Sequence, residues 1–397
     1  MLSLEEALAR IIRTVKPLSS EKIPIVDADE RIIAGMIKTA IPLPLFDNSA
    51  MDGYALRSDD LVGASREKPV SLKLIGEAPA GRSVQFQIRR GECVRIFTGS
   101  PIPSGVDAVL MQEDTHAIGS EIQCFDKTIP GENIRRRGED IETGTILCEP
   151  GRVVGPGLIS LLASCGISEI PVIRRARVAL LATGDELQQP GRPLAPGQIY
   201  ESNRTTLATL LRRTGAIPSL LPVVPDTLKD TVAALDQALT LGDLVVTSGG
   251  ASVGGHDYIK EALQKLGGTL DLWRVAIKPG KPFLFGQCRG KLLFGLPGNP
   301  VSAFVTFLAF VRPALLFMQG QKQSSFRPAS GNLVAAVQNP GDRRHFFRVR
   351  LREDGKVEIP KGQASHMLHS LSIANGLIDV PPATNLAAGT TVQVLLF

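Results

Sequence analysis

The stretch LVVTSGGASVGGHDYIKEAL, Leu244 to Leu263, joins an apolar run to an amphipathic helix through a turn rich in glycine and serine. The apolar run lacks polar alternation, which is typical of a strand buried on both faces of a parallel sheet. The helix after the turn supplies the crossover that such a sheet needs. The stretch therefore predicts one unit of a doubly wound α/β domain, with the turn at the carboxyl end of its strand.

The same order of apolar strand, turn and helix recurs on both sides of this stretch. Strands are expected at 176–183, 216–224 and 291–296, and the last is followed by the most apolar segment of the chain, Val301–Met318. Because Arg312 interrupts that segment and it opens like the helix of a soluble protein, it predicts a buried helix rather than a membrane span.

The remaining regions favour β-structure. Short alternating runs separated by Gly and Pro fill residues 71–128, and similar runs continue from about Phe326 to the end. Residues 141–166 contain an extended piece and a short helix, and they fit a return to the segment before the first β region, which would make that region an insertion. Ser3 and Glu6 form the pattern of a capping box on an N-terminal helix.

Composition excludes several classes of protein. The 397-residue chain has a formal net charge of +5 and no basic run interleaved with aromatic residues, so nucleic acid is not an expected partner. Its 5 cysteines are odd in number and form no CxxC pair, which argues against a disulfide framework and a zinc ribbon. Charged residues run through the N-terminal segment, where a signal peptide would be apolar. We expect a cytoplasmic protein without a membrane partner.

Three turns should meet at the carboxyl ends of the parallel strands, namely 183–186, 247–257 and 296–299. Their glycines allow close backbone approach, and Ser248 and Ser252 add hydroxyl donors, as an oxyanion site requires. The spacing fits neither a Walker A loop nor a GxGxxG dinucleotide loop. Such glycines also occur merely to turn the chain tightly, and the turns alone leave both interpretations open.

Two lysines favour the anion site. Lys278 and Lys281 flank a rigid Pro-Gly turn in IKPGKP. The acidic residues nearby, Glu186, Asp226 and Asp257, would repel a phosphate unless a cation such as Mg²⁺ bridged them. Taken singly, Glu186 also fits a helix-start carboxylate and Asp226 an N-cap. His366 and His369 have no third ligand nearby and are interpreted as surface residues.

Seven motifs together resemble one family. They are DNSAMDGYALR (47–57), VRIFTGSPIPSGVDAVLMQED (94–114), NIRRRGEDI (133–141), LLATGDEL (180–187), TSGGASVGGHDY (247–258), AIKPGKPFLFG (276–286) and GLPGNPVSAFVTF (295–307). In this order they resemble the molybdopterin molybdenumtransferase family, called MoeA in bacteria, to which the E domain of gephyrin is similar. The resemblance spans nearly the whole chain.

The resemblance implies an elongated subunit of several domains. Residues 1–24 would form an N-terminal helix packing on the α/β domain, 25–45 and 141–170 a linking domain I, and 46–140 an inserted β domain II. Residues 171–322 would form the α/β molybdopterin-binding domain III, and 323–397 a C-terminal β domain IV.

The implied activity is insertion of molybdate into adenylylated molybdopterin with release of AMP, dependent on Mg²⁺. The implied assembly is a homodimer, and partners could include a molybdopterin adenylyltransferase and molybdoenzymes or cofactor-carrier proteins. Two other functions stay open, a non-catalytic scaffold of the gephyrin kind and a nucleotide-pterin binding protein or a different nucleotide enzyme on the same fold.

The resemblance also assigns site residues by position. Catalysis is assigned to Asp257, Glu186, Asp226, Lys278, Lys281, Asp52 and Asp140. Binding of the pterin nucleotide is assigned to Thr183, Gly184, Ser248, Gly249, Gly250, Ser252, Arg274, Thr98, Pro297, Gly298 and Asn299. Molybdate is assigned to Ser252, Lys281, Pro282, Arg348 and Ser365, and Mg²⁺ to Glu186 and Asp257. Asp52, Thr98 and Asp140 would reach the cleft from the partner subunit.

Three positions depart from the family's pattern. Most relatives have an acidic residue at Gly255, many have Lys at Arg274, and Ala364 replaces a usual glycine. The first could alter Mg²⁺ binding, and the last makes the placement of Ser365 the least certain of these assignments. None removes the chemistry.

Overall fold

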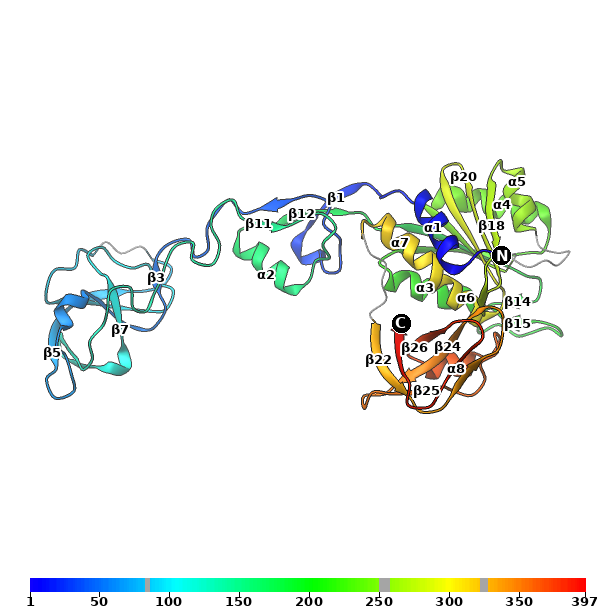
Figure 1. The fold of residues 1–397 in the computed structure, drawn as a ribbon. Coiled ribbons are helices and arrows are strands. Elements are labelled where there is room, and N and C mark those ends of the chain that lie inside the picture. The colour runs from blue at the N-terminus through cyan, green and yellow to red at the C-terminus, as the bar shows by residue number, and fades with distance from the viewer. Residues whose placement is uncertain (83–85, 250–257, 322–327) are drawn as a thin grey trace.

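The computed structural model describes residues 1–82, 86–249, 258–321 and 328–397. The chain is elongated: an α/β domain and a C-terminal β barrel lie at one end, and a β domain lies at the other end of a narrow linking region (Figure 1).

The α/β domain is built on a six-stranded sheet in the order β16-β13-β17-β21-β20-β18. Four neighbouring strands are parallel: β16 (Ile217–Val224), β13 (Arg177–Thr183), β17 (Leu244–Ser248) and β21 (Lys291–Leu296). The antiparallel strands β20 (Pro282–Cys288) and β18 (Thr269–Arg274) complete one edge. The fully buried β17 confirms the prediction of a strand covered on both faces.

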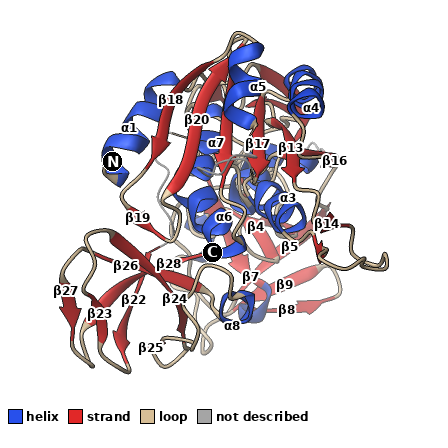
Figure 2. Cartoon of the chain, turned by 90° about the vertical axis from the view of Figure 1, so that its right-hand side faces the viewer, coloured by secondary structure: helices blue, strands red, loops and turns tan. Residues whose placement is uncertain are grey.

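Helices cover both faces of this sheet, which confirms the doubly wound fold (Figure 2). One face packs on α3 (Asn203–Arg213) together with α6 (Pro300–Thr306) and α7 (Arg312–Met318). The other face packs on α4 (Leu228–Leu241) and α5 (Ile259–Lys265).

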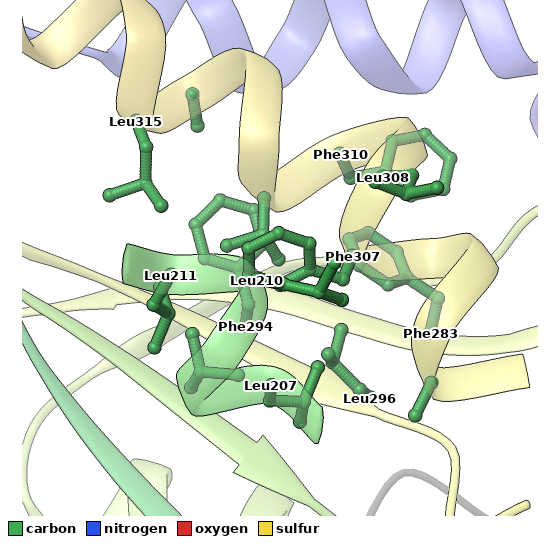
Figure 3. Close-up of a cluster of buried hydrophobic side chains, with 14 of the residues drawn as sticks. Leu207, Leu210, Leu211, Phe283, Phe294, Leu296, Phe307, Leu308, Phe310 and Leu315 are labelled. Carbon is green, nitrogen blue, oxygen red and sulfur yellow. The ribbon is translucent and has the colours of Figure 1, made fainter. Parts of the chain in front are cut away.

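The apolar helix is part of the core. Among the described residues, Pro300–Met318 is long and apolar enough to cross a membrane, but 83% of that window is buried in the protein. A π-helical turn, η4 (Phe307–Val311), joins α6 to α7, and the ring of Phe310 lies 4.4 Å from that of Phe283 (Figure 3). The prediction of a buried helix is confirmed.

The N-terminal helix α1 (Leu4–Thr14) packs against α7, and its capping box between Ser3 and Glu6 is present. The boundary expected at residue 24 needs a correction, because the linking region already begins with β1 (Ser20–Pro24). β1 pairs antiparallel with β12 (Glu169–Ile173), so the backbone hydrogen bonds of these residues lie in the linking region.

The linking region is formed by two segments distant in sequence. Besides β1 and β12 it contains a turn of 3-10 helix, η1 (Ile25–Asp27), and helix α2 (Pro156–Ser164). Its second strand pair joins β2 (Ile37–Lys38) to β11 (Ile146–Cys148). The chain thus leaves for the distal β domain after β2 and returns before β11.

The distal β domain is a six-stranded sheet in the order β7-β4-β6-β5-β9-β8. Its strands are β4 (Gly53–Leu56), β5 (Val70–Ala78), β6 (Glu92–Ile96), β7 (Ala108–Met111), β8 (Thr115–Ile118) and β9 (Glu121–Cys124). A short pair, β3 (Asn48–Ser49) with β10 (Ile134–Arg135), closes its base. Two turns of 3-10 helix, η2 (Ser58–Leu61) and η3 (Gln112–Asp114), connect strands.

The C-terminal domain is a barrel, because β26 pairs with both β28 and β24 and closes the sheet. Its elements are β22 (Pro328–Leu333), β23 (Val337–Asn339), β24 (Arg344–Leu351), β25 (Lys356–Glu358), α8 (Leu368–Ile373), β26 (Gly376–Val380), β27 (Thr384–Leu386) and β28 (Thr391–Leu396). A short strand from the α/β region, β19 (Ile277–Lys278), pairs with β24 and ties the two domains together (Figure 2).

Candidate functional site

The three predicted turns meet at the carboxyl ends of the parallel strands. The Gly249 N–H donates to the Leu296 carbonyl over 3.1 Å, which joins the turn after β17 to the turn after β21. Gly249 has a φ of +82°, and a Cβ built on it would lie 3.0 Å from the carbonyl oxygen of Thr183. A side chain there would be strained and would press on the turn after β13, so glycine permits this approach.

Acidic residues gather at the turn after β13. The Asp226 N–H donates to the Asp185 carboxylate over 3.0 Å, and the Asp185 N–H lies 3.4 Å from the Asp226 carboxylate. The exposed Glu186 carboxylate lies over Gly184, where a Cβ would be 2.5 Å from Oε2. The N-cap interpretation of Asp226 is wrong: Thr227 caps α4 by accepting the Asp230 N–H, which leaves Asp226 on the turn.

Sequence reasoning missed Asn203, at the start of α3. Its side-chain amide donates to the Ser248 hydroxyl oxygen over 2.8 Å and to the Gly298 carbonyl over 2.7 Å. The partners lie 45 and 95 positions away, so no local pattern indicates them. The available signal is the polar cluster Glu201 to Arg204, which was not singled out from the sequence.

The lysine turn lies beside this corner. Gly280, between the two lysines, has a φ of +112°, and a Cβ there would be 2.6 Å from the Thr306 methyl group of α6. The turn therefore packs tightly on the helix that follows the Leu296–Asn299 turn, while the Lys278 and Lys281 side chains are exposed. Arg274 pairs with Pro282 across β18 and β20, near the same turn.

Arg348 of the barrel is buried against the loop that carries Ser365. Its side chain is 1% exposed, and its guanidinium donates to the carbonyls of Gly362 and Ala364 over 3.0 and 3.1 Å and to Gln363 Oε1 over 3.3 Å. Arg348 therefore holds the loop, and its assignment to molybdate stays a prediction.

The loop held by Arg348 reaches the glycine corner. The carbonyl of Ser365, which is half-buried, accepts the Val301 N–H over 3.1 Å at the start of α6. Pro297 is buried, while Gly298 and Asn299 are exposed beside it. The loop of the barrel that carries Ser365 thus lies next to the start of α6, while the assignment of Ser365 to molybdate stays a prediction.

His345 on β24 lies beside the lysine turn. It pairs in register with Lys278, is 6% exposed and stacks 3.7 Å from the Phe347 ring, while its Nε2 has no partner among the described residues. Burial, followed by the charges of Lys278, Arg348 and Arg343, lowers the pKa of His345 to about 4. Burial therefore favours the neutral imidazole most, and the surrounding cations add to the effect.

Three predicted residues lie away from this corner. Asp52 accepts the Thr98 N–H over 2.7 Å and the Thr98 hydroxyl over 2.8 Å, and these bonds lower the pKa of Asp52. Both residues belong to the distal β domain, which lies far from the α/β domain (Figure 1), and exposed Asp140 follows β10, with its N–H donating to the Leu43 carbonyl. Within one chain they do not meet the glycine corner.

Four of the named positions, Gly250, Ser252, Gly255 and Asp257, lie outside the described residues. Within the described part of the chain, no three His, Cys, Asp or Glu side chains gather as a metal site. The corner instead offers backbone N–H groups, a serine hydroxyl, lysines and carboxylates, which together suit a phosphate ligand bridged by a cation.

Family comparisons cover most of the chain. Residues 2–166 match the MoeA N-terminal region (domain I and II), and residues 179–316 match a probable molybdopterin binding domain. Residues 331–397 match the MoeA C-terminal region (domain IV).

Individual relatives match end to end. The molybdopterin molybdenumtransferase of Haemophilus influenzae is 39% identical, over 99% of this chain and 98% of the relative. Molybdopterin molybdenumtransferase 2 of Mycobacterium tuberculosis (strain H37Rv) is 37% identical over 98% and 97%. The crystal structure of the molybdopterin biosynthesis MoeA protein from Pyrococcus horikoshii is 33% identical, with a TM-score of 0.86, over 100% of this chain and 99% of that one.

Proposed function

The chain belongs to the molybdopterin molybdenumtransferase (MoeA) family and is a transferase of molybdenum cofactor biosynthesis, and from this premise we propose that it inserts molybdate into adenylylated molybdopterin with release of AMP. One observation carries the proposal: the glycine corner and the Ser365 loop meet at the start of α6, and the lysine turn packs against Thr306 at the end of the same short helix. A phosphate site and an oxyanion site would then be neighbours, as a reaction between a phosphoanhydride and molybdate requires.

The phosphates of the pterin nucleotide would bind at Thr183, Gly184 and the Ser248–Gly249 turn. Backbone N–H groups and the Ser248 hydroxyl can donate to phosphate oxygens there. Lys278 and Lys281 would place their ammonium groups against the charges of phosphate and molybdate, and Ser365 would face molybdate from the barrel. Electrostatic positioning of this kind supplies most of the catalysis in phosphoryl chemistry.

We propose Mg²⁺ as the cation of the site. Asp185 and Glu186 follow β13, the backbone of Asp185 and that of Asp226 after β16 each reach the other's carboxylate, and Mg²⁺ takes one or two carboxylates together with phosphate oxygens and water. The exposed Glu186 carboxylate fits a ligand of the ion, and Asp257, outside the described residues, is proposed as the second. Mg²⁺ would neutralise phosphate charge when bound, and the protein carboxylates would orient it.

We propose a homodimer as the complete catalytic unit. Asp52 and Thr98 lie at the far end of the chain from the glycine corner, so their expected role needs a second copy (Figure 1). The partner subunit's distal β domain would bring them, with Asp140, to the cleft. We also propose a cytoplasmic location, with an adenylyltransferase supplying the substrate and molybdoenzymes or carrier proteins receiving the product.

The function is tested by single-turnover conversion of adenylylated molybdopterin by the purified protein. AMP release and the molybdenum cofactor should form together when molybdate and Mg²⁺ are both present, and Lys281→Ala should weaken the dependence on molybdate. Binding of the substrate without conversion under all conditions would contradict the proposal and favour a scaffold or carrier.

A further inference from the structure

Asn203 joins two of the three turns of the glycine corner. Its amide nitrogen donates to Ser248 Oγ over 2.8 Å and to the Gly298 carbonyl over 2.7 Å. A carbonyl oxygen can only accept, so the Gly298 contact fixes which atom of the amide is nitrogen. Both N–H bonds of the amide are then used, one for each turn.

The contact decides how Ser248 presents its hydroxyl group. Ser248 is 2% exposed, and its oxygen already accepts from Asn203. A hydroxyl has one proton, and within the described residues no acceptor takes that of Ser248. With one of its two lone pairs occupied by the amide, the hydroxyl keeps its proton to donate to an oxyanion at the corner.

Asn203 is itself held firmly. Its neighbours in sequence, Glu201 and Arg204, form an ion pair at 3.2 Å, and both side chains are less than 10% exposed. Glu201 also accepts the Arg204 N–H over 2.7 Å, and the Arg204 guanidinium donates to the Leu221 carbonyl of β16. The start of α3 is thereby tied to β16 through Arg204, which Glu201 holds in place.

We infer that Asn203 is a positioning residue of the phosphate site, which orients the Ser248 hydroxyl as a donor to the ligand and keeps the turns after β17 and β21 in register. This inference rests on the proposed function, because it takes a nucleotide phosphate as the ligand. Asn203 acts through Ser248 and the Gly298 carbonyl and does not itself take part in the chemistry.

AMP is the probe, and its affinity is measured by calorimetry in the presence of Mg²⁺ on the full-length protein. Asn203→Ala and Ser248→Ala should each weaken AMP binding about tenfold, the effect of one hydrogen bond to a charged group. The double variant should be no weaker than the single variants, because Asn203→Ala removes the orientation of the same hydroxyl that Ser248→Ala removes. Binding of adenosine, which lacks the phosphate, should stay unchanged in all three.

Asn375→Ala is the matched control. Asn375 in the barrel also makes two hydrogen bonds, each of 2.8 Å, with the backbone of Leu351, and its loss should leave AMP affinity unaltered. The inference is overturned if Asn203→Ala binds AMP normally, if the two single effects multiply in the double variant, or if adenosine binding falls equally. Failure of the proposed function gives a different result. The variants would then show these AMP affinities, but the wild-type protein would insert no molybdenum.

Discussion

The buried His345 offers a direct test of the charge in the candidate oxyanion site. Its pKa is lowered from 6.5 to about 4 by burial and by the cations Lys278, Arg348 and Arg343. We predict that Lys278→Met raises the pKa of His345 towards 6.5, because it removes the largest of the charge effects. Molybdate bound at the lysine turn should raise it as well, since an anion favours the imidazolium form.

The assay is NMR titration of protein labelled with ¹³C at histidine Cε1, where 5 histidines give few signals. Lys356→Met, at an exposed lysine of β25, is the control and should leave the His345 pKa unchanged. A wild-type His345 that titrates near 6.5, or that does not respond to Lys278→Met, would refute the cationic cluster.

The same shift predicts how stability depends on pH. The folded pKa is below the unfolded value, so between about pH 6.5 and 4 the unfolded chain binds a proton that the folded chain does not. This contribution to stability is complete above pH 6.5 and is lost as the pH falls. A pKa shift from 6.5 to about 4 lowers the free energy of unfolding by about 3 kcal/mol below pH 4. Hydrogen exchange at β24 should show the loss in wild type but not in His345→Phe.

Three further predictions concern neighbouring contacts. Thr98→Val should raise the pKa of Asp52 in part, because it removes the hydroxyl bond and keeps the backbone bond, and carboxyl NMR should then show Asp52 protonating at higher pH. Gly280→Ala should weaken molybdate binding, measured by calorimetry, by about tenfold or more, because the turn must move away from Thr306. Thr306→Ser, which removes the methyl group, should restore part of the affinity in the Gly280→Ala variant. Unchanged affinity in Gly280→Ala would contradict the packing. Arg348→Lys should cost roughly 2 to 4 kcal/mol in the barrel, because lysine cannot bond all three acceptors, and faster hydrogen exchange at the Val301 amide should reveal the released Ser365 loop.

Periodicity was enough to predict the architecture, because buried strands and amphipathic helices follow from local patterns. The four parallel strands, the core helix and the two β domains follow from such patterns. The glycine turns were predictable as well, since the carboxyl ends of parallel strands meet at one edge.

Contacts between distant segments were not predictable in the same way. Asn203 reaches Ser248 and Gly298 across the sheet edge, and β19 leaves the α/β region to join the barrel. A sequence pattern also says little about the partners of a charged side chain, so the bonds from Arg348 to the Gly362–Ala364 loop were not predicted. At Asp226 the choice between neighbouring capping residues depended on one hydrogen bond, made by Thr227.

The most direct measurement is the position of molybdenum in crystals grown with AMP, Mg²⁺ and molybdate, located by anomalous scattering at the molybdenum edge. Our account predicts a molybdenum peak between the lysine turn and the Ser365 loop, next to the AMP phosphate at the Ser248–Gly249 turn. A molybdenum peak away from Lys281 and Ser365, with AMP bound at the glycine corner, would contradict it.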